Sequence, residues 1–133
     1  GGLRKSMPMY AAIFLFTSFA SIGLPGLNGF VGEFMILMGS YPTFKVLTSV
    51  AAFGVVLAAI YMLWAYQRMF NGQLDNDENS VLKDLSSKEL VAVGPLLVLM
   101  LFIGIYPSFI ESYVVQDVSV IYESINNLIG VSQ

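Results

Sequence analysis

The sequence contains no cysteine and no histidine. Their absence excludes disulfides, thiol nucleophiles, cysteine-bound iron–sulfur clusters, and haem or zinc ligation by either residue within this chain. The nine acidic residues form no compact group with metal-ligand spacing. The net charge of −3 and six dispersed basic residues leave no basic patch that would hold a phosphate backbone. We therefore expect no metal, no redox cofactor and no nucleic-acid partner on this chain.

Charge of either sign is scarce. Charged residues make up 11% of the chain and hydrophobic residues 56%, and the mean hydropathy is +0.75. A soluble globule of this length needs more polar surface than this. The apolar residues fall in long blocks, and a block of about 20 residues is what a helix needs to cross roughly 30 Å of hydrocarbon. The composition predicts an all-α protein with several membrane-spanning helices, surrounded by a lipid bilayer.

Three membrane segments and one amphipathic helix are expected from the pattern. The pattern predicts a broken transmembrane helix in residues 7–40 and two further transmembrane helices in residues 44–70 and 89–106. It predicts the amphipathic helix in residues 107–129. Because the chain begins at Gly1 and shows no signal-peptide pattern, we expect 1–133 to be a single fragment of a larger membrane domain. Residues 71–88 predict a hydrophilic cytoplasmic loop, which carries Asp75, Asp77, Glu78, Lys83 and Asp84.

The first segment contains an interruption rich in glycine and proline. The segment is too long for one straight crossing at about 1.5 Å per residue, yet residues 30–40 alone reach only about 16 Å. Asn28 is expected to cap a helix that begins at Phe30. Glycine and proline supply the backbone angles of a break, and the predicted break residues are Gly23, Pro25, Gly26, Asn28 and Gly29.

Basic residues distinguish one broken helix from two separate ones. If the first segment crosses once, Lys45 lies on one side of the membrane and the other five basic residues lie on the opposite side. This distribution obeys the positive-inside rule. If it crosses twice, the basic residues divide equally between the two sides. We therefore predict three crossings, the first one discontinuous, with the amino end cytoplasmic and the carboxyl end outside.

Glu33 is the only charged residue between Lys5 and Lys45. A carboxylate within hydrocarbon costs about 2.5 to 3.5 kcal/mol on insertion scales, so its default interpretation is functional. We expect Glu33 in the first turn of the half-helix that starts at Phe30. There the helix dipole favours the charged form and burial favours the protonated form. Two structural alternatives stay open. Glu33 could cap backbone amides or pair with a lysine elsewhere, without changing its protonation. The Pro-Gly interruption could be a turn that joins two membrane helices and has no further function.

Aromatic residues gather near the end of the second segment, at Tyr61, Trp64 and Tyr66, beside Gln67 and Arg68. They predict an aromatic belt at the membrane interface, with a cation whose side chain extends to water. In the alternative interpretation, Tyr61 and Tyr66 face a hydrated channel. Lys45 is expected to be an interfacial anchor at the other end of this segment. In 107–129 the polar face lacks basic residues, so it predicts packing on a partner subunit or on the chain's own bundle. Its apolar positions are Ile110, Val114, Val118, Ile121, Ile125 and Leu128.

Two stretches carry a family resemblance, Gly1-Gly-Leu-Arg-Lys-Ser-Met-Pro8 and Ser21-Ile-Gly-Leu-Pro-Gly-Leu-Asn-Gly-Phe-Val-Gly-Glu-Phe-Met-Ile-Leu37. They resemble the carboxyl-terminal part of the antiporter-like subunits of respiratory complex I, and most of all the subunit M branch, the counterpart of mitochondrial subunit 4. Similar segments occur in multisubunit cation/proton antiporters and membrane-bound hydrogenases. The resemblance covers essentially the whole chain.

This resemblance implies a proton-translocating subunit of NADH:quinone oxidoreductase in a bacterial inner membrane. It implies that Glu33 is a proton relay, that its partner lysines and a further glutamate lie on other helices, and that the partners are other membrane-arm subunits. NADH, flavin, iron–sulfur clusters and quinone would be bound by other subunits. The alternatives are a cation/proton antiporter or hydrogenase subunit, and a structural membrane anchor in which Glu33 never changes protonation.

Overall fold

The computed structural model describes residues 1–74 and 77–129, and all regular elements in this part of the chain are helices. The predicted all-α class is therefore confirmed for these residues. Asp75 of the expected polar loop lies outside them, as do the side chains of Asp77, Glu78 and Leu128. The elements in chain order are α1 (Leu3–Ser6), α2 (Pro8–Ser21), α3 (Asn28–Ser40), α4 (Lys45–Phe70), the 3-10 helix η1 (Asp77–Val81), α5 (Ser87–Ile105) and α6 (Ser108–Ile129).

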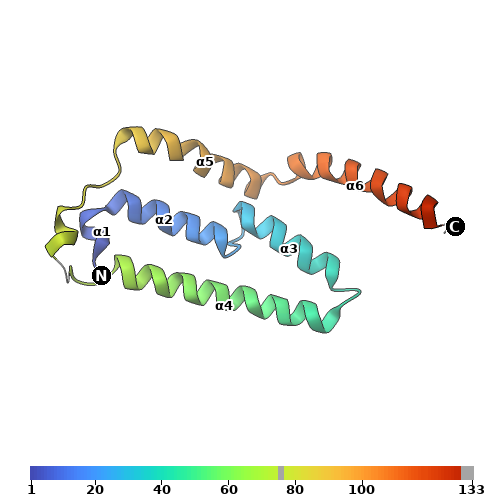
Figure 1. Cartoon of the computed structure of the whole chain (residues 1–133), viewed down its shortest axis with the longest axis horizontal. Helices are drawn as coiled ribbons and strands as arrows, with labels where there is room; N and C mark the ends of the chain where they lie inside the picture. The colour runs from blue at the N-terminus through green and yellow to red at the C-terminus, as the bar shows by residue number, and fades with distance from the viewer. Residues whose placement is uncertain (75–76, 130–133) are drawn as a thin grey trace.

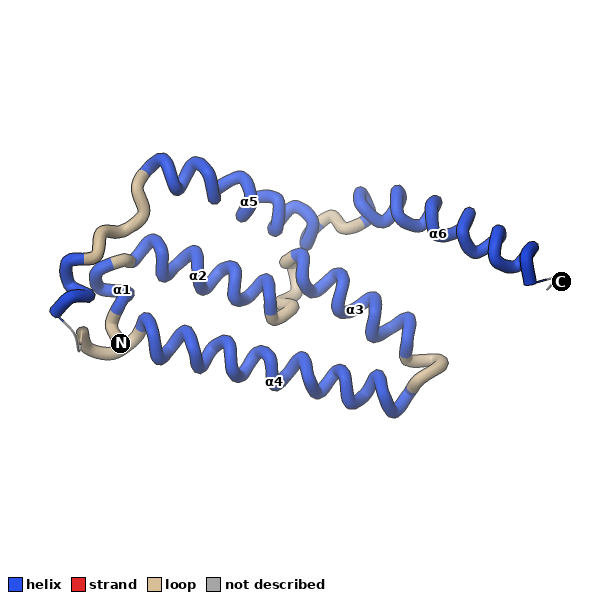
Figure 2. Tube along the Cα trace, in the orientation of Figure 1, coloured by secondary structure: helices blue, strands red, loops and turns tan. Residues whose placement is uncertain are grey.

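Helices α2 and α3 follow one another in roughly the same direction, and α4 runs back along both of them (Figure 1). At a rise of about 1.5 Å per residue, α2 and α3 are about 21 and 20 Å long, and α4 is about 39 Å long. The continuous helix α4 thus matches the combined length of the two short ones. Figure 2 shows the interruption as a short loop between α2 and α3.

Helix α5 packs against α3, and α6 continues away from the bundle beyond the carboxyl end of α5 (Figure 1). Among the described residues two helices, α4 and α5, are long and apolar enough to cross a membrane, and α2 is a shorter apolar helix. Ser86 is the N-cap of α5 and forms a capping box: its side chain accepts from the backbone N–H of Glu89, while the Glu89 carboxylate accepts from the Ser86 N–H at 2.7 Å. This local pairing explains why α5 starts two residues before the expected position at 89.

A small aromatic core joins α2 to the last turns of α4. Ala11, Tyr66 and Phe70 are buried, and Phe14 packs against both rings, with its centroid 5.1 Å from that of Phe70. Tyr66 and Phe70 stack with centroids 4.9 Å apart. Such aromatic pairs contribute about 0.5 to 1.5 kcal/mol beyond the burial of their area. The core therefore holds the amino end of α2 against the carboxyl end of α4.

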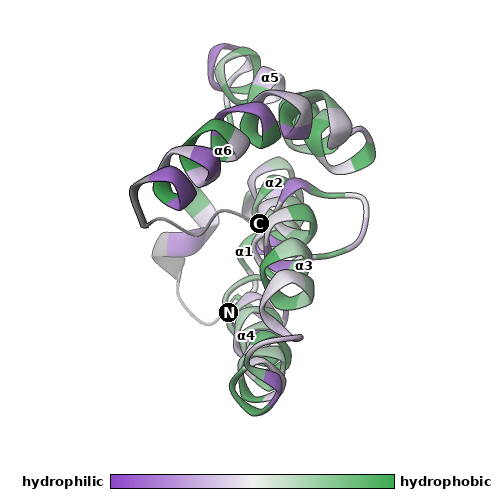
Figure 3. Cartoon of the chain, turned by 90° about the vertical axis from the view of Figure 1, so that its right-hand side faces the viewer, coloured by the Kyte–Doolittle hydropathy of each residue, from purple (hydrophilic) through white to green (hydrophobic). Residues whose placement is uncertain are grey.

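The expected interfacial belt is partly wrong, because Tyr66 belongs to this core and is only 7% exposed. Trp64 and Tyr61 remain exposed, and the Arg68 guanidinium lies over the Trp64 ring, 5.2 Å from its centroid. Tyr66 is buried because α2 places small and aromatic side chains opposite it, which the pattern of α4 alone does not reveal. Hydrophobic residues predominate along α3 and α4, whereas hydrophobic and hydrophilic residues alternate along α6 (Figure 3).

Basic residues gather at one end of the bundle. Arg4 and Lys5 lie on α1, Arg68 lies in the last turn of α4, and Lys88 lies at the start of α5. These elements meet at the end of the bundle that also holds the amino terminus (Figure 1). Lys45 begins α4 at the opposite end. Among the described residues, Lys and Arg are therefore concentrated at one end of the bundle, which we call the basic end although it also holds Asp84 and Glu89, and the other end carries one cation.

Gly104 brings α5 against the interruption. A Cβ at this position would overlap the backbone of Gly26 and Leu27, which cannot move aside as a flexible side chain can. Only glycine therefore lets α5 approach the α2–α3 junction this closely. Gly94, on the same helix, has open space around its missing side chain.

We predict opposite effects for alanine at these two glycines. Gly104→Ala should separate α5 from the junction and lower thermal stability by about 1 to 3 kcal/mol, the usual cost of overpacking. Gly94→Ala, the matched control, should be neutral or stabilise α5 by up to about 1 kcal/mol through helix propensity. The thermal transition of the purified, assembled protein measures both. Equal stability of the two variants would show that the contact at Gly104 is not tight.

Candidate functional site

Helix α2 ends in a Schellman motif centred on Gly23. The Leu24 N–H donates to the carbonyl oxygen of Phe19 at 3.0 Å, and the Gly23 N–H donates to that of Ala20 at 3.4 Å. Gly23 has φ +69°, the left-handed conformation that this motif requires at its fifth position. Two of the last carbonyls of α2 are satisfied in this way, which is the requirement for ending a helix inside apolar surroundings.

A tight turn follows immediately. The Leu27 N–H donates to the carbonyl oxygen of Leu24 at 3.1 Å, so Pro25 and Gly26 occupy the two central positions of the turn. Gly26 has φ +93°. Proline followed by a residue of positive φ is the pattern of a type II turn. The chain thus leaves α2 and enters α3 through two consecutive hydrogen-bonded turns.

Helix α3 begins at Asn28, two residues earlier than expected, and Leu27 is its N-cap. The prediction that Asn28 caps this helix is wrong. No side chain caps α3, and the Oδ1 atom of Asn28 is buried without a hydrogen-bond partner. Asn28 fails as a cap because it already has helical geometry, whereas a capping residue must lie outside the helix with an extended backbone.

The first turn of α3 packs directly on the last turn of α2. A Cβ at Gly29 would overlap the carbonyl group of Ala20, so this glycine permits the close approach of the two half-helices. Among the predicted break residues, Gly23 and Gly26 thus supply left-handed angles, and Gly29 supplies close packing. Pro25 supplies the turn.

Glu33 lies against the interruption from the side of α3. Its Oε2 atom is 2.6 Å from the position that a Cβ of Gly23 would occupy, and its Cδ atom is 3.3 Å from that position. Side chains on a helix tilt toward its amino end, so Glu33 turns back to the junction. The absence of a side chain at Gly23 makes room for this carboxylate.

The predicted place of Glu33 in the first turn of α3 is wrong, because α3 starts at Asn28 and Glu33 is its sixth residue. Glu33 therefore approaches the helix terminus with its side chain rather than from a terminal backbone position. Its side chain is half-buried. Within residues 1–74 and 77–129 it makes neither an ion pair nor a hydrogen bond with another side chain.

A groove of about 330 Å³ lies on another face of α3, between that helix and the junction of α5 with α6. Most of its lining is apolar, and its polar members are Asn28 and Glu111. Glu33 does not line it. A neighbouring groove of about 310 Å³ runs past Gly26 and Gly104 and also reaches Glu111. The Glu33 carboxylate therefore projects from one side of α3, whereas Glu111 of α6 lies beside another side of that helix.

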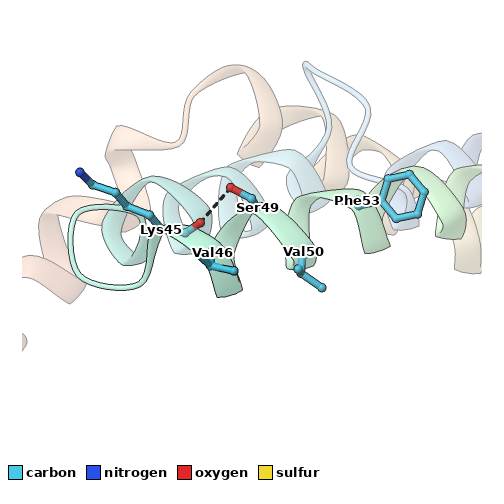
Figure 4. Close-up of a pocket in the computed structure, with 5 residues that line it drawn as sticks. All are labelled: Lys45, Val46, Ser49, Val50 and Phe53. Atoms are coloured by element: carbon cyan, nitrogen blue, oxygen red, sulfur yellow. Dashed lines mark hydrogen bonds between the residues drawn. The ribbon is translucent and has the colours of Figure 1, made fainter.

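Another cavity is remote from the interruption. It measures about 450 Å³ and is lined only by residues of the first turns of α4, including Lys45, Ser49 and Phe53. Figure 4 shows the Lys45 side chain extending away from the helix, and the Ser49 hydroxyl donating to the Lys45 carbonyl oxygen at 2.8 Å. Because a single helix lines it, this cavity is a shallow depression and holds no converging polar groups. The described residues contain no group of acidic side chains suited to a metal ion.

Two residues near the interruption were missed by sequence reasoning. Gly104 is a single glycine in an apolar helix, and nothing in its local pattern marks it as a contact. Glu111 lies in the first turn of α6, and its place in both grooves depends on the angle at which α6 leaves α5. Neither position has a local signal that would have identified it.

Residues 1–60 match a family model described as NADH:quinone oxidoreductase/Mrp antiporter, transmembrane. The chain is 42% identical over 117 residues to NADH-quinone oxidoreductase subunit M of Rhodobacter capsulatus, covering 86% of this chain. It is 38% identical over 107 residues to NADH-ubiquinone oxidoreductase chain 4 of Arabidopsis thaliana, covering 80% of this chain. In both cases the match spans 22% of the relative, so the chain corresponds to about a fifth of their length.

A solved structure has the same fold over most of the chain. A chain of respiratory complex I from Thermus thermophilus, with bound NADH, superposes with a TM-score of 0.71 at 37% sequence identity. The match covers 81% of this chain and 22% of that one. At this identity the likeness extends beyond the fold to the sequence.

We predict that alanine at Gly23 and at Gly26 has different effects on Glu33. Both substitutions place a side chain on a left-handed backbone, which costs about 1 to 2 kcal/mol. Only Gly23→Ala also displaces the Glu33 carboxylate, since the space around Gly26 is open. The infrared carboxyl band of Glu33, assigned by its loss in Glu33→Gln, should therefore shift in Gly23→Ala and stay unchanged in Gly26→Ala. Equal band positions in the two variants would contradict the placement of Glu33.

Proposed function

The chain belongs to the NADH:quinone oxidoreductase/Mrp antiporter family of membrane subunits, and we propose that it is part of a proton-translocating subunit of a respiratory NADH:quinone oxidoreductase. The named relatives support the complex, since those matching over most of the chain are subunits of NADH-quinone or NADH-ubiquinone oxidoreductases. The translocating role, and the residues that carry it, are inferred from the geometry of the interruption.

The observation that carries this proposal is the Glu33 carboxylate beside Gly23, where α2 ends and α3 begins. An intramembrane carboxylate is costly unless it has a use. Here it lies beside the end of a half-helix, where exposed backbone groups and partial dipoles favour bound water and ions. We infer that Glu33 accepts a proton from one side of this junction and releases it to the other. Gly23, Pro25, Gly26, Asn28 and Gly29 form the junction on which this relay depends.

The arrangement of the helices supports a single crossing by α2 and α3 together. Each is too short to cross roughly 30 Å of hydrocarbon, whereas α4, which runs along both, is long enough. Together with α4 and α5 this makes three crossings. The basic end of the bundle then faces the cytoplasm by the positive-inside rule, in a bacterial inner membrane. Glu33 lies in the half of the broken helix that is farther from this basic end.

Other subunits supply the chemistry of electron transfer in this proposal. NADH, flavin, iron–sulfur clusters and quinone belong to them, and the partners of this chain are the other membrane-arm subunits. Redox energy released elsewhere reaches Glu33 as a change in the hydration and charge around the junction. The cations that would face the Glu33 carboxylate are expected on helices beyond these 133 residues.

A second candidate function is cation/proton antiport without NADH. The description of the matched family supports it, because that description names Mrp antiporters beside the oxidoreductase. A structural membrane anchor in which Glu33 never titrates is the third possibility. Cation-driven proton movement in membranes without NADH would support the antiporter function, whereas proton movement that strictly requires NADH and quinone would support the oxidoreductase.

We predict that Glu33→Gln in the assembled complex lowers proton translocation per electron at least about tenfold, since an amide cannot exchange the proton and general acid–base groups contribute about 10² to 10⁴. Glu33→Asp should retain part of the activity, because it keeps the carboxyl group but withdraws it from Gly23. Proton uptake by vesicles during NADH oxidation measures both variants.

The matched control is Glu123→Gln, which removes the same charge from an exposed position on α6 and should pump normally. Normal pumping by Glu33→Gln would overturn the relay. Loss of pumping with intact assembly and intact electron transfer to an artificial acceptor would instead exclude the anchor.

A further inference from the structure

The amino end of α2 is capped by Asp84, an aspartate from the connection between η1 and α5. Asp84 accepts hydrogen bonds from the backbone N–H groups of Met9 at 2.7 Å and Tyr10 at 3.0 Å, across 75 and 74 residues of sequence. Pro8, the first residue of α2, has no N–H to satisfy. Asp84 therefore takes the role that an adjacent N-cap side chain has in other helices. Met7, which precedes α2, provides no side-chain cap.

The same carboxylate is joined rigidly to the start of α5. Its Oδ1 atom also accepts from the Leu85 N–H at 2.8 Å, and the next residue, Ser86, begins the capping box of α5. Only Leu85 and Ser86 separate the clamp from the first residue of the helix. The amino ends of α2 and α5 are thus held together through one side chain.

The opposite end of α5 meets the interruption at Gly104, which fits against the backbone of Gly26 and Leu27. Helix α5 contacts α3 near its carboxyl end (Figure 1), and α2 packs against α1, α3 and α4. The register of α5 relative to the junction therefore depends on its two ends. Sliding α5 by one residue moves Gly104 by about 1.5 Å, which is enough to bring a neighbouring side chain into the junction.

We propose that Asp84 is a positioning residue: by clamping the amino ends of α2 and α5 it sets the register of Gly104 against the junction, and so holds the place of Glu33. This inference rests on the proposed function, because its test uses proton translocation to detect a change in the position of Glu33. Asp84 itself touches no reacting proton in this scheme. It acts through the two helices that it joins.

The clamp is charged at neutral pH. Partial burial raises the pKa of Asp84, but hydrogen bonds from the N–H groups of Met9, Tyr10 and Leu85 lower it, and the net effect holds the pKa below its ordinary value. A group of lowered pKa contributes stability at higher pH and loses it as the pH falls through the folded-state value. The clamp therefore persists through mildly acidic conditions. Its hydrogen bonds are charge-assisted and lie at the positive end of the α2 dipole.

The test uses hydrogen exchange and proton pumping in the assembled complex. Asp84→Ala should speed exchange of the Met9 and Tyr10 amides at least about tenfold, the loss expected for hydrogen bonds to a charged group. It should also reduce protons translocated per electron while electron transfer to an artificial acceptor continues. Asp84→Asn should give a smaller change in both, because its amide keeps one acceptor oxygen. If the alanine variant does not assemble, exchange and pumping are measured on Asp84→Asn instead.

Asp117→Asn is the matched control, since it removes an equal charge from an exposed position on α6 and should alter neither readout. Unchanged exchange at Met9 and Tyr10 in the Asp84 variants would overturn the clamp. Faster exchange with normal pumping would overturn the positioning role. If Glu33→Gln pumps normally, the proposed function fails and the positioning role fails with it, while the exchange data still report on the clamp itself.

Discussion

Backbone hydrogen bonding at the interruption between α2 and α3 is the constraint on which the rest of this structure depends. In apolar surroundings each unsatisfied backbone group costs several kcal/mol, so a helix can stop there only if its last carbonyls find donors. Gly23 and Leu24 supply these donors, and Pro25 removes an N–H that would otherwise need an acceptor. The break is therefore compact, and both half-helices remain aligned along α4.

The same geometry creates the site. A left-handed glycine is needed to end α2, and because it lacks a side chain it leaves room for the Glu33 carboxylate. Gly29 and Gly104 then bring α3 and α5 against the junction. One carboxylate thus lies against the end of α2, in a chain whose cations gather mainly at one end of the bundle.

Local patterns predicted the helical class and the place of the interruption, because apolar blocks and glycine–proline pairs act over a few residues. They failed where the outcome depended on how α3 begins. Starting the helix at Asn28 rather than Phe30 removed Asn28 as a cap and moved Glu33 out of the first turn. Tyr66 was expected at an interface, yet Ala11 and Phe14 of α2 bury it. Each error concerns a register or a partner that a single helix does not contain.

The sequence by itself determined a membrane-type helical chain, an interruption rich in glycine, and one isolated carboxylate near it, since these follow from composition, dihedral preferences and the cost of charge in hydrocarbon. Only the tertiary structure decided that Glu33 lies against Gly23, that Gly104 closes on the junction, and that Asp84 caps a helix 75 residues away. The physical reason is the separation in sequence over which each kind of interaction acts. Backbone preferences act between neighbours, whereas these contacts depend on the relative registers of packed helices.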